Sequence, residues 1–185
     1  MERADKGSVT VGGSELTGMS EDQLARFRGG SVGIVFQSFH LIPNMTALEN
    51  VAVPLELAGV PRAFDAAREE LAAVGLAERT SHYPSQMSGG EQQRVAIARA
   101  LAGSPRVLLA DEPTGNLDSQ MARGVMELLE EINAAGTTIL MVTHDPELAA
   151  RAHRNVHIID GQVSDLTHET ARSLANAAAA HATTA

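Results

Sequence analysis

The chain has 185 residues, of which 44% are hydrophobic and 20% are charged, as is typical of one globular domain. Its net charge of −9, its single lysine and an aromatic content of 3% exclude a nucleic-acid-binding surface, which needs clustered basic and stacking side chains. The lack of cysteine excludes disulfides and thiolate chemistry. Because there is neither an apolar run of about 18 residues nor a signal-peptide core, we expect a cytoplasmic protein.

The N-terminal part predicts a small antiparallel β piece followed by a helix and a strand. Residues 7–14 combine a short apolar stretch with a glycine turn. Ser20 and Gln23 have the spacing of a capping box, which starts a helix. The apolar run 32–36 then predicts a buried strand that delivers Gln37 to a loop.

The middle of the chain predicts helices. Thr46 and Glu49 have capping-box spacing, and we expect Pro54 to kink or end the helix that they start. Apolar residues at helical spacing predict a second helix over 63–74. We expect a helical subdomain over about 44–102.

A glycine-rich helix start follows at Ser88. Ser88 and Glu91 have capping-box spacing, and Gly89 and Gly90 would leave the first N–H groups of the helix unobstructed. Such a helix start binds anions, because unpaired N–H groups and the helix dipole both favour negative charge. The same residues also fit an ordinary capped helix.

Two adjacent acids end the next predicted strand. Asp111 and Glu112 follow the apolar run 107–110. A carboxylate at a strand end can bind Mg²⁺, and a second one beside it can orient and deprotonate a water molecule. An acidic turn before Pro113 is the plainer interpretation.

The C-terminal part predicts alternating strands and helices, and therefore a parallel sheet with crossover helices. A buried strand is expected over 137–143, and His144 at its end could donate a hydrogen bond to a phosphoryl group. Asp145 is a good helix cap, residues 156–163 predict a hairpin, and the alanine-rich tail 169–185 predicts disorder.

Together these motifs resemble an ATP-binding-cassette (ABC) ATPase. The resemblance rests on five motifs in the family's order: the Q-loop glutamine Gln37, the signature sequence Met87–Glu91, the Walker B strand with catalytic glutamate Val107–Glu112, the D-loop Gly115–Asp118 and the switch histidine His144.

The resemblance implies an α/β fold: a RecA-like P-loop NTPase core with a parallel sheet, a small antiparallel β piece and a helical subdomain, spanning residues 1–168 as a partial ABC ATPase domain. It implies ATP and Mg²⁺ as cofactors. The implied site residues are Glu112 and His144 for catalysis, Gln37, Ser88, Gly89, Gly90, Asp111 and Asp118 for nucleotide binding, and Gln37 and Asp111 for the metal.

The resemblance also implies partners. A second ABC subunit, identical or different, would form a head-to-tail dimer, and an integral membrane permease would hold the dimer on the inner face of the membrane. The stretches 36–43, 47–51 and 111–118 are similar to the ATPases of the lipoprotein-releasing and macrolide-exporter group.

One family motif has no counterpart in the sequence. No Gly-x-x-x-x-Gly-Lys-[Ser/Thr] occurs, and the only lysine, Lys6, follows no glycine. We therefore expect a chain that begins after its phosphate loop and hydrolyses little ATP alone. Two alternatives stay open: a non-catalytic paralogue that gives only its signature motif to a partner's site, and a soluble ABC ATPase that moves no solute.

Overall fold

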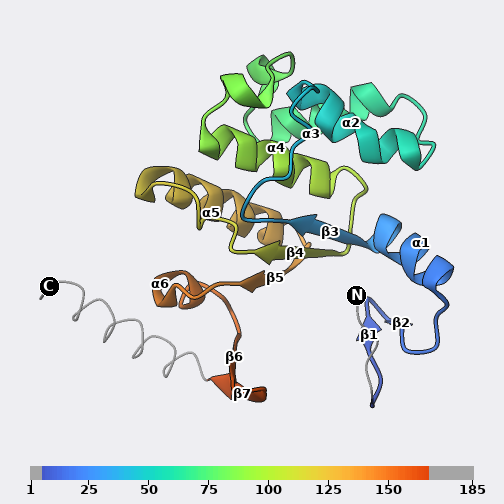
Figure 1. Ribbon diagram of the computed structural model, residues 1–185, viewed down its shortest axis with the longest axis vertical. Helices are drawn as coiled ribbons and strands as arrows, with labels where there is room; N and C mark the ends of the chain where they lie inside the picture. The colour runs from blue at the N-terminus through green and yellow to red at the C-terminus, as the bar shows by residue number, and fades with distance from the viewer. Residues whose placement is uncertain (1–5, 167–185) are drawn as a thin grey trace, which may run out of the picture. The chain divides into compact units, whose positions relative to one another are not determined.

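The computed structural model describes residues 6–166 and divides the chain into two compact units, Met1–Met141 and Val142–Ala185. The predicted disordered tail, 169–185, lies outside the described residues. The elements, coloured along the chain in Figure 1, are β1 (Thr10–Val11), β2 (Ser14–Glu15), α1 (Glu21–Ser31), β3 (Val32–Val35), α2 (Ala47–Leu57), α3 (Ala63–Ala73), the 3₁₀ turns Ala77–Arg79 and Pro84–Gln86, α4 (Gly89–Leu101), β4 (Val107–Asp111), α5 (Ser119–Ala134), β5 (Thr138–Val142), α6 (Pro146–Ala149), β6 (Asn155–Ile159) and β7 (Gln162–Leu166).

The first elements match the prediction closely. β1 and β2 form an antiparallel pair, and the turn between them has positive φ at Gly12 (56°) and Gly13 (80°), which glycine adopts without steric cost. At the start of α1 the Ser20 hydroxyl accepts from Gln23 N, and the Gln23 side chain accepts from Ser20 N at 2.8 Å. The predicted antiparallel piece and this capping box are confirmed.

The central sheet has the strand order β3-β4-β5. β3 and β4 are parallel, with Val32 opposite Val107 and Val35 opposite Ala110, so the predicted parallel sheet is confirmed. Parallel neighbours end at the same edge of a sheet, and Gln37 and Asp111 therefore leave the sheet close to one another.

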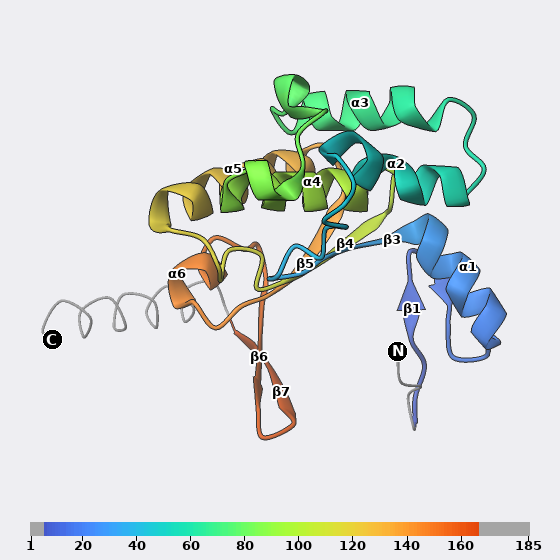
Figure 2. The same cartoon turned by 45° about the horizontal axis from the view of Figure 1, so that its top comes forward.

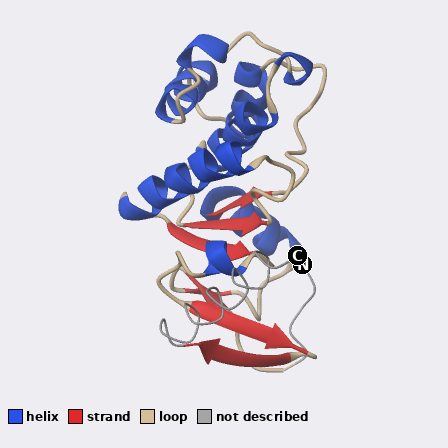
Figure 3. Cartoon of the chain, turned by 90° about the vertical axis from the view of Figure 1, so that its left-hand side faces the viewer, coloured by secondary structure: helices blue, strands red, loops and turns tan. Residues whose placement is uncertain are grey.

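β5 is more exposed than its sequence suggests. The prediction of a buried strand is wrong, since Leu140 is 58% exposed and Val142 is 57% exposed. β5 follows β4 at the end of the strand order, and α4 and α5 lie over one face of this sheet (Figures 1 and 3). A β-branched, apolar strand can therefore form without being covered on both faces.

Helices α2, α3 and α4 pack together on the side of α4 away from the sheet (Figures 1 and 2). The capping box of Thr46 and Glu49 is confirmed at the start of α2. Of the two outcomes expected at Pro54, a kink or an end, the end does not occur: α2 continues to Leu57, and Ala58 N donates to Pro54 O at 3.1 Å. Proline removes one donor, but its fixed φ suits a helix and the bonding resumes one turn later.

The helix α4 lies directly on β3. A Cβ added to Gly33 would clash with the backbone oxygen of Ala100, and it would lie 2.9 Å from Leu108 Cδ1. Because the obstructing oxygen belongs to the backbone, it cannot move aside as a flexible side chain could. The absence of a side chain at position 33 therefore sets how closely α4 approaches the sheet.

The second unit contains α6 and the hairpin of β6 and β7. Asp145 Oδ1 accepts from Glu147 N at 2.8 Å, which confirms the predicted cap. Asp160 and Gly161 have positive φ (48° and 76°), as expected for the tight turn of a hairpin. The predicted hairpin is thus confirmed.

No helix within residues 6–166 combines the length and the apolar character needed to cross a membrane.

Candidate nucleotide site

Gln37 and the acids of β4 emerge at neighbouring strand ends. Asp111 is the last residue of β4 and is exposed, while Glu112 is half-buried. Glu112 has a φ of 45°, an uncommon value for a residue with a Cβ. This conformation turns the chain away from the sheet, and the turn is closed by Gly115 N, which donates to Glu112 O at 3.0 Å.

Gln37 is hydrogen-bonded to the segment that follows this turn. Gln37 Nε2 donates to Asn116 Oδ1 at 3.3 Å, and Asn116 Nδ2 donates to Gln37 O at 3.1 Å. Gly115 makes this approach possible, because a Cβ there would lie 2.5 Å from Gln37 Nε2. Two predicted motifs, distant in sequence, are thus joined directly.

The amide of Gln93, on α4, contacts both strand ends. Its Nε2 donates to Pro113 O at 2.6 Å and to Phe36 O at 3.4 Å. Gln93 is fully buried, so these bonds lie in the interior of the unit. Phe36 directly precedes Gln37, and Pro113 directly follows Glu112.

Arg99, also on α4, holds the loop after Gln37. Its guanidinium donates to Phe39 O at 2.9 Å and to His40 O at 2.6 Å. Both of these loop residues have positive φ, 59° and 48°. The two charge-assisted bonds compensate for the unfavourable backbone conformation of the loop.

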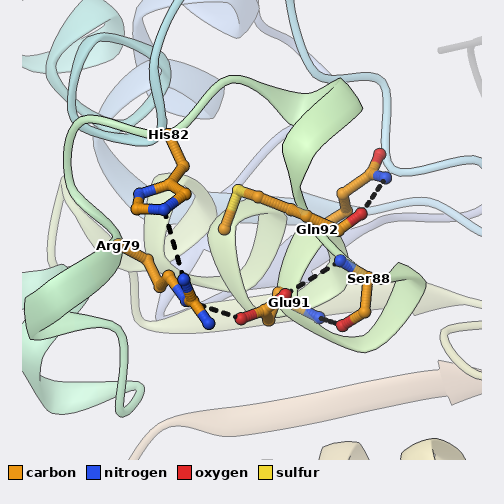
Figure 4. Close-up of polar contacts among 6 residues, drawn as sticks. Arg79, His82, Ser88, Glu91 and Gln92 are labelled. Carbon is orange, nitrogen blue, oxygen red and sulfur yellow. Dashed lines mark hydrogen bonds and ion pairs between the residues drawn. The ribbon is translucent and has the colours of Figure 1, made fainter.

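The start of α4 is capped as predicted (Figure 4). Glu91 N donates to Ser88 Oγ at 3.2 Å, and Ser88 N donates to Glu91 Oε2 at 2.8 Å. Arg79 forms an ion pair with Glu91 at 2.9 Å and contacts His82 Nε2 at 3.2 Å. The Ser88 backbone N–H is the main cause that lowers the pKa of Glu91 below 4.5, and the Ser88 hydroxyl and Arg79 act in the same direction.

The two glycines of this helix start face side chains from the D-loop and α5. A Cβ on Gly89 would lie 3.1 Å from Leu117 Cδ2, and one on Gly90 would lie 3.2 Å from Met121 Cβ. Gly90 N donates to Met121 Sδ at 3.3 Å. The expectation of unobstructed N–H groups is therefore wrong for Gly90, which is buried and already has a weak acceptor.

Asp118 acts as a helix cap, and His144 lies in the second unit. Asp118 caps α5, because its Oδ1 accepts from Gln120 N at 3.0 Å and from Met121 N at 2.9 Å. His144 belongs to the second unit, where it is exposed. Of the predicted site residues, the structure joins Gln37 to the turn after Glu112 and places Gly89 and Gly90 against the segment that contains Asp118.

Sequence reasoning missed the roles of Gln93, Arg99, Asn116 and Met121. Asn116 lies inside the D-loop motif Gly115–Asp118, and its place in that motif could have indicated a functional role. Gln93 and Arg99 interrupt the apolar pattern of α4, which marks them as polar residues with buried partners without revealing those partners. Nothing in the local sequence of Met121 indicates a contact with Gly90.

The donor set at the strand ends suits Mg²⁺. A carboxylate oxygen of Asp111 and the amide oxygen of Gln37 are hard ligands of the kind that this ion prefers. Because Nε2 of Gln37 donates to Asn116, Oε1 is the atom of this amide that could coordinate a cation. Residues 6–166 contain no group of three or more histidine, aspartate or glutamate side chains arranged to hold a metal by themselves, so a bound nucleotide and water would have to supply further ligands.

Comparison with known protein families gives one match that covers most of the chain. The family model described as ABC transporter matches residues 1–115.

Relatives of known name are similar over nearly the whole chain. The lipoprotein-releasing system ATP-binding protein LolD of Geobacter metallireducens is 51% identical over 166 residues, which cover 88% of this chain and 74% of LolD. The macrolide export ATP-binding/permease protein MacB of Burkholderia pseudomallei is 48% identical over 165 residues, but this chain spans only 25% of MacB.

A solved structure has the same fold. It is the dimeric ATP-binding cassette MJ0796 in a post-hydrolysis state with ADP and phosphate, which has a TM-score of 0.76 and 38% identity. The match covers 90% of this chain and 76% of that one. It confirms the predicted α/β fold with its parallel sheet, small antiparallel sheets and helices.

Proposed function

The chain belongs to the ABC transporter family, whose LolD- and MacB-type members are ATP hydrolases, and we propose that it is the ATP-binding subunit that drives a membrane permease. The observation that carries the proposal is the contact between Gln37 and Asn116, which joins the loop after β3 to the turn after Glu112. Residues of suitable chemistry for Mg²⁺ and for water activation are thereby held at one edge of the sheet.

We assign the predicted site residues as follows. Asp111 and Gln37 would hold Mg²⁺, which when bound neutralises charge on the phosphates of ATP. Glu112 would orient the attacking water and accept its proton. His144 would donate a hydrogen bond to the γ-phosphate. The left-handed backbone at Glu112 and the closed turn that follows it fix the carboxylate relative to the end of β4.

The start of α4 would serve a second nucleotide. Ser88, Gly89 and Gly90 would contact the ATP held by another cassette, where the helix N-terminus favours negative charge. Asp118 would lie at the same dimer interface while it caps α5. The dimeric state of the MJ0796 cassette supports this head-to-tail arrangement.

The permease and the location are inferred from the relatives. LolD is named for a lipoprotein-releasing system, and MacB is named as both ATP-binding protein and permease. A chain of this type would lie on the cytoplasmic face of the membrane, held there by its permease. The helical subdomain of α2, α3 and α4 would pass motion to that partner, because α4 contacts the Gln37 loop through Arg99.

We expect this chain alone to bind Mg·ATP weakly and to hydrolyse it little, because its sequence holds no Gly-x-x-x-x-Gly-Lys-[Ser/Thr]. The test is the melting temperature with increasing Mg·ATP, which rises with ligand concentration if the native state binds. The wild type should be stabilised and Asp111→Asn should not. The exposed Asp22→Asn in α1 is the matched control. The proposal fails if Mg·ATP stabilises the wild type no more than Asp111→Asn.

The same sequence feature favours a second candidate, a non-catalytic subunit that serves only a partner's site. The two candidates differ in a mixture with an ABC cassette from the same cell whose sequence contains a Gly-x-x-x-x-Gly-Lys-[Ser/Thr] motif. If this chain is only a donor, Ser88→Arg abolishes the hydrolysis gained on mixing and Glu112→Gln leaves it unchanged. If both sites work, either substitution lowers hydrolysis by about 100-fold or to the level of the remaining site.

A further inference from the structure

Gln93 is the one fully buried amide that contacts both strand ends of the site among the residues described. It lies on the sheet side of α4 with 0% exposure. Its Nε2 is shared between Pro113 O and Phe36 O, at 2.6 Å and 3.4 Å. A buried amide is unfavourable unless it is hydrogen-bonded, so the position of this side chain and the positions of both carbonyls depend on one another.

The hydrogen bonds of Gln93 lie just beyond the last backbone pairing between β3 and β4. The register of β3 with β4 ends at Val35 and Ala110. Phe36 and Asp111 come next on the two strands and are followed by Gln37 and Glu112, and the register includes no backbone pairing among these residues. The Gln93 amide therefore takes over from the sheet in setting the separation of these two segments.

The contacts continue beyond the strand ends. Gln37 and Asn116 are joined by their two hydrogen bonds, which closes a network from α4 through Phe36 and Gln37 to Asn116 and back through Pro113. The side chains of Gln93, Gln37 and Asn116 are each held by at least one hydrogen bond to another residue of this network. A change at Gln93 should therefore reach Gln37 without direct contact between the two side chains.

Stability alone does not explain a glutamine here. Oε1 of Gln93 is buried and has no hydrogen-bond partner among the residues described. A buried acceptor without a partner is unfavourable, and an apolar side chain of similar shape avoids that cost. Compared with an apolar residue, a glutamine at this position lowers the stability of the fold through its unpaired Oε1, while its Nε2 donates two hydrogen bonds that an apolar residue cannot make.

We propose that Gln93 is a positioning residue, which ties α4 to the peptide groups next to Gln37 and Glu112. Because Ser88 caps the N-terminus of α4, a displacement of this end of the helix moves the Gln93 amide and, with it, the two strand ends. The inference rests on the proposed function for the roles of Gln37 and Glu112. The placement of these residues by Gln93 does not depend on it.

The experiment compares Gln93→Met with Val95→Ala in the whole chain. Methionine has nearly the volume of glutamine but donates no hydrogen bond, whereas Val95→Ala opens a cavity in the same helix at a residue with 0% exposure. NMR spectra of ¹⁵N-labelled protein follow the side-chain amide signals of Gln37 and Asn116, and thermal melts give the stability of each variant. Gln92→Met is a second control, since Gln92 donates to Met87 O on another side of α4.

In Gln93→Met we expect the Gln37 and Asn116 side-chain amides to shift and to exchange with water at least tenfold faster, with a melting temperature close to that of the wild type. In Val95→Ala the melting temperature should fall while both amide signals keep their positions. Unchanged amide signals and exchange in Gln93→Met would overturn the proposal. So would the same changes in Val95→Ala, because they would then report lost stability alone.

A second measurement separates this inference from the proposed function. Mg·ATP should shift the Gln37 side-chain signal in the wild type and should shift it at least fivefold less in Gln93→Met. If Mg·ATP leaves the wild-type signal unchanged, the role of Gln37 in nucleotide binding is wrong, while the exchange rates without nucleotide still decide the role of Gln93.

Discussion

Gln37 and Asn116, which are 79 residues apart in sequence, exchange two hydrogen bonds and so fix the loop after β3 against the turn after β4. This pairing requires Gly115, where a Cβ would lie 2.5 Å from Gln37 Nε2. The side chain of Gln37 is flexible, and it can move away from a new methyl group without unfolding the sheet.

Gly115→Ala should therefore separate the two residues at a modest cost in stability. We expect a loss of about 1 kcal/mol, the size of one hydrogen bond in a protein. The measurement is thermal melting together with the Asn116 side-chain amide signal in NMR. A variant in which that signal keeps its wild-type position would show that the pair does not depend on the glycine.

Gly33→Ala should destabilise the fold more strongly, because the added methyl group meets the backbone oxygen of Ala100. Overpacking of this kind costs about 1–3 kcal/mol, and each kcal/mol lowers the melting temperature by about 2–4 °C in a chain of this size. Gly29→Ala in α1 is the matched control, since no atom lies within 4 Å of its added Cβ. The control should be neutral or stabilising by about 0.5–1 kcal/mol. Equal melting temperatures for the two variants would contradict this account of Gly33.

Glu91 should make the start of α4 sensitive to acid. Its pKa is lowered below 4.5 mainly by the Ser88 backbone N–H, so the folded state favours the charged form. The resulting stability is fully present above about pH 5 and is lost as the pH falls through the lowered pKa of the folded state.

The comparison is with Glu91→Gln, which keeps a side-chain acceptor for Ser88 N but carries no charge. Melting temperatures of the two proteins should differ most near neutral pH and should converge as the pH falls through the lowered pKa of Glu91 in the folded state. The side chains of Arg79 and Glu91 are 47% and 27% exposed, so solvent partly screens their ion pair and the difference should also shrink in high salt. A gap that stays constant from pH 7 to pH 3 would show that the charge of Glu91 contributes nothing.

Gly90 and Met121 should show an energetic coupling. Gly90→Ala places a methyl group 3.2 Å from Met121 Cβ and Cγ, and we expect a cost of about 1–3 kcal/mol, partly offset by the better helix propensity of alanine. Met121→Ala removes Cγ and Sδ from this contact and leaves only Cβ, so the same substitution at position 90 should cost less there. A double-mutant cycle by chemical denaturation should give a coupling of about 1 kcal/mol. Gly29→Ala combined with Met121→Ala should be additive, and additivity in the Gly90 cycle as well would refute the contact.

Helix starts and turns could be predicted from the sequence because their signals are local. The capping boxes at Ser20, Thr46 and Ser88 need only residues three positions apart, and the hairpin turn needs only Asp160 and Gly161. The parallel character of the sheet followed from the alternation of strands and helices from Val107 onward.

Features that depend on distant neighbours could not be predicted. The exposure of Leu140 and Val142 depends on which elements cover β5, and no pattern within the strand encodes that. The passage of α2 through Pro54 depends on packing against other helices, which overrides the local preference. Likewise, the contacts of Gln93 join residues 20 and 57 positions away.

The close fit of Gly89 and Gly90 against Leu117 and Met121 has a consequence for how such sequences diverge. The four positions share one fixed volume, so a larger residue at either glycine is tolerated only together with a smaller one on the D-loop or α5. The signature and the D-loop of one chain should therefore change in pairs over evolution. Swapping either motif alone between related proteins should fail where swapping both succeeds.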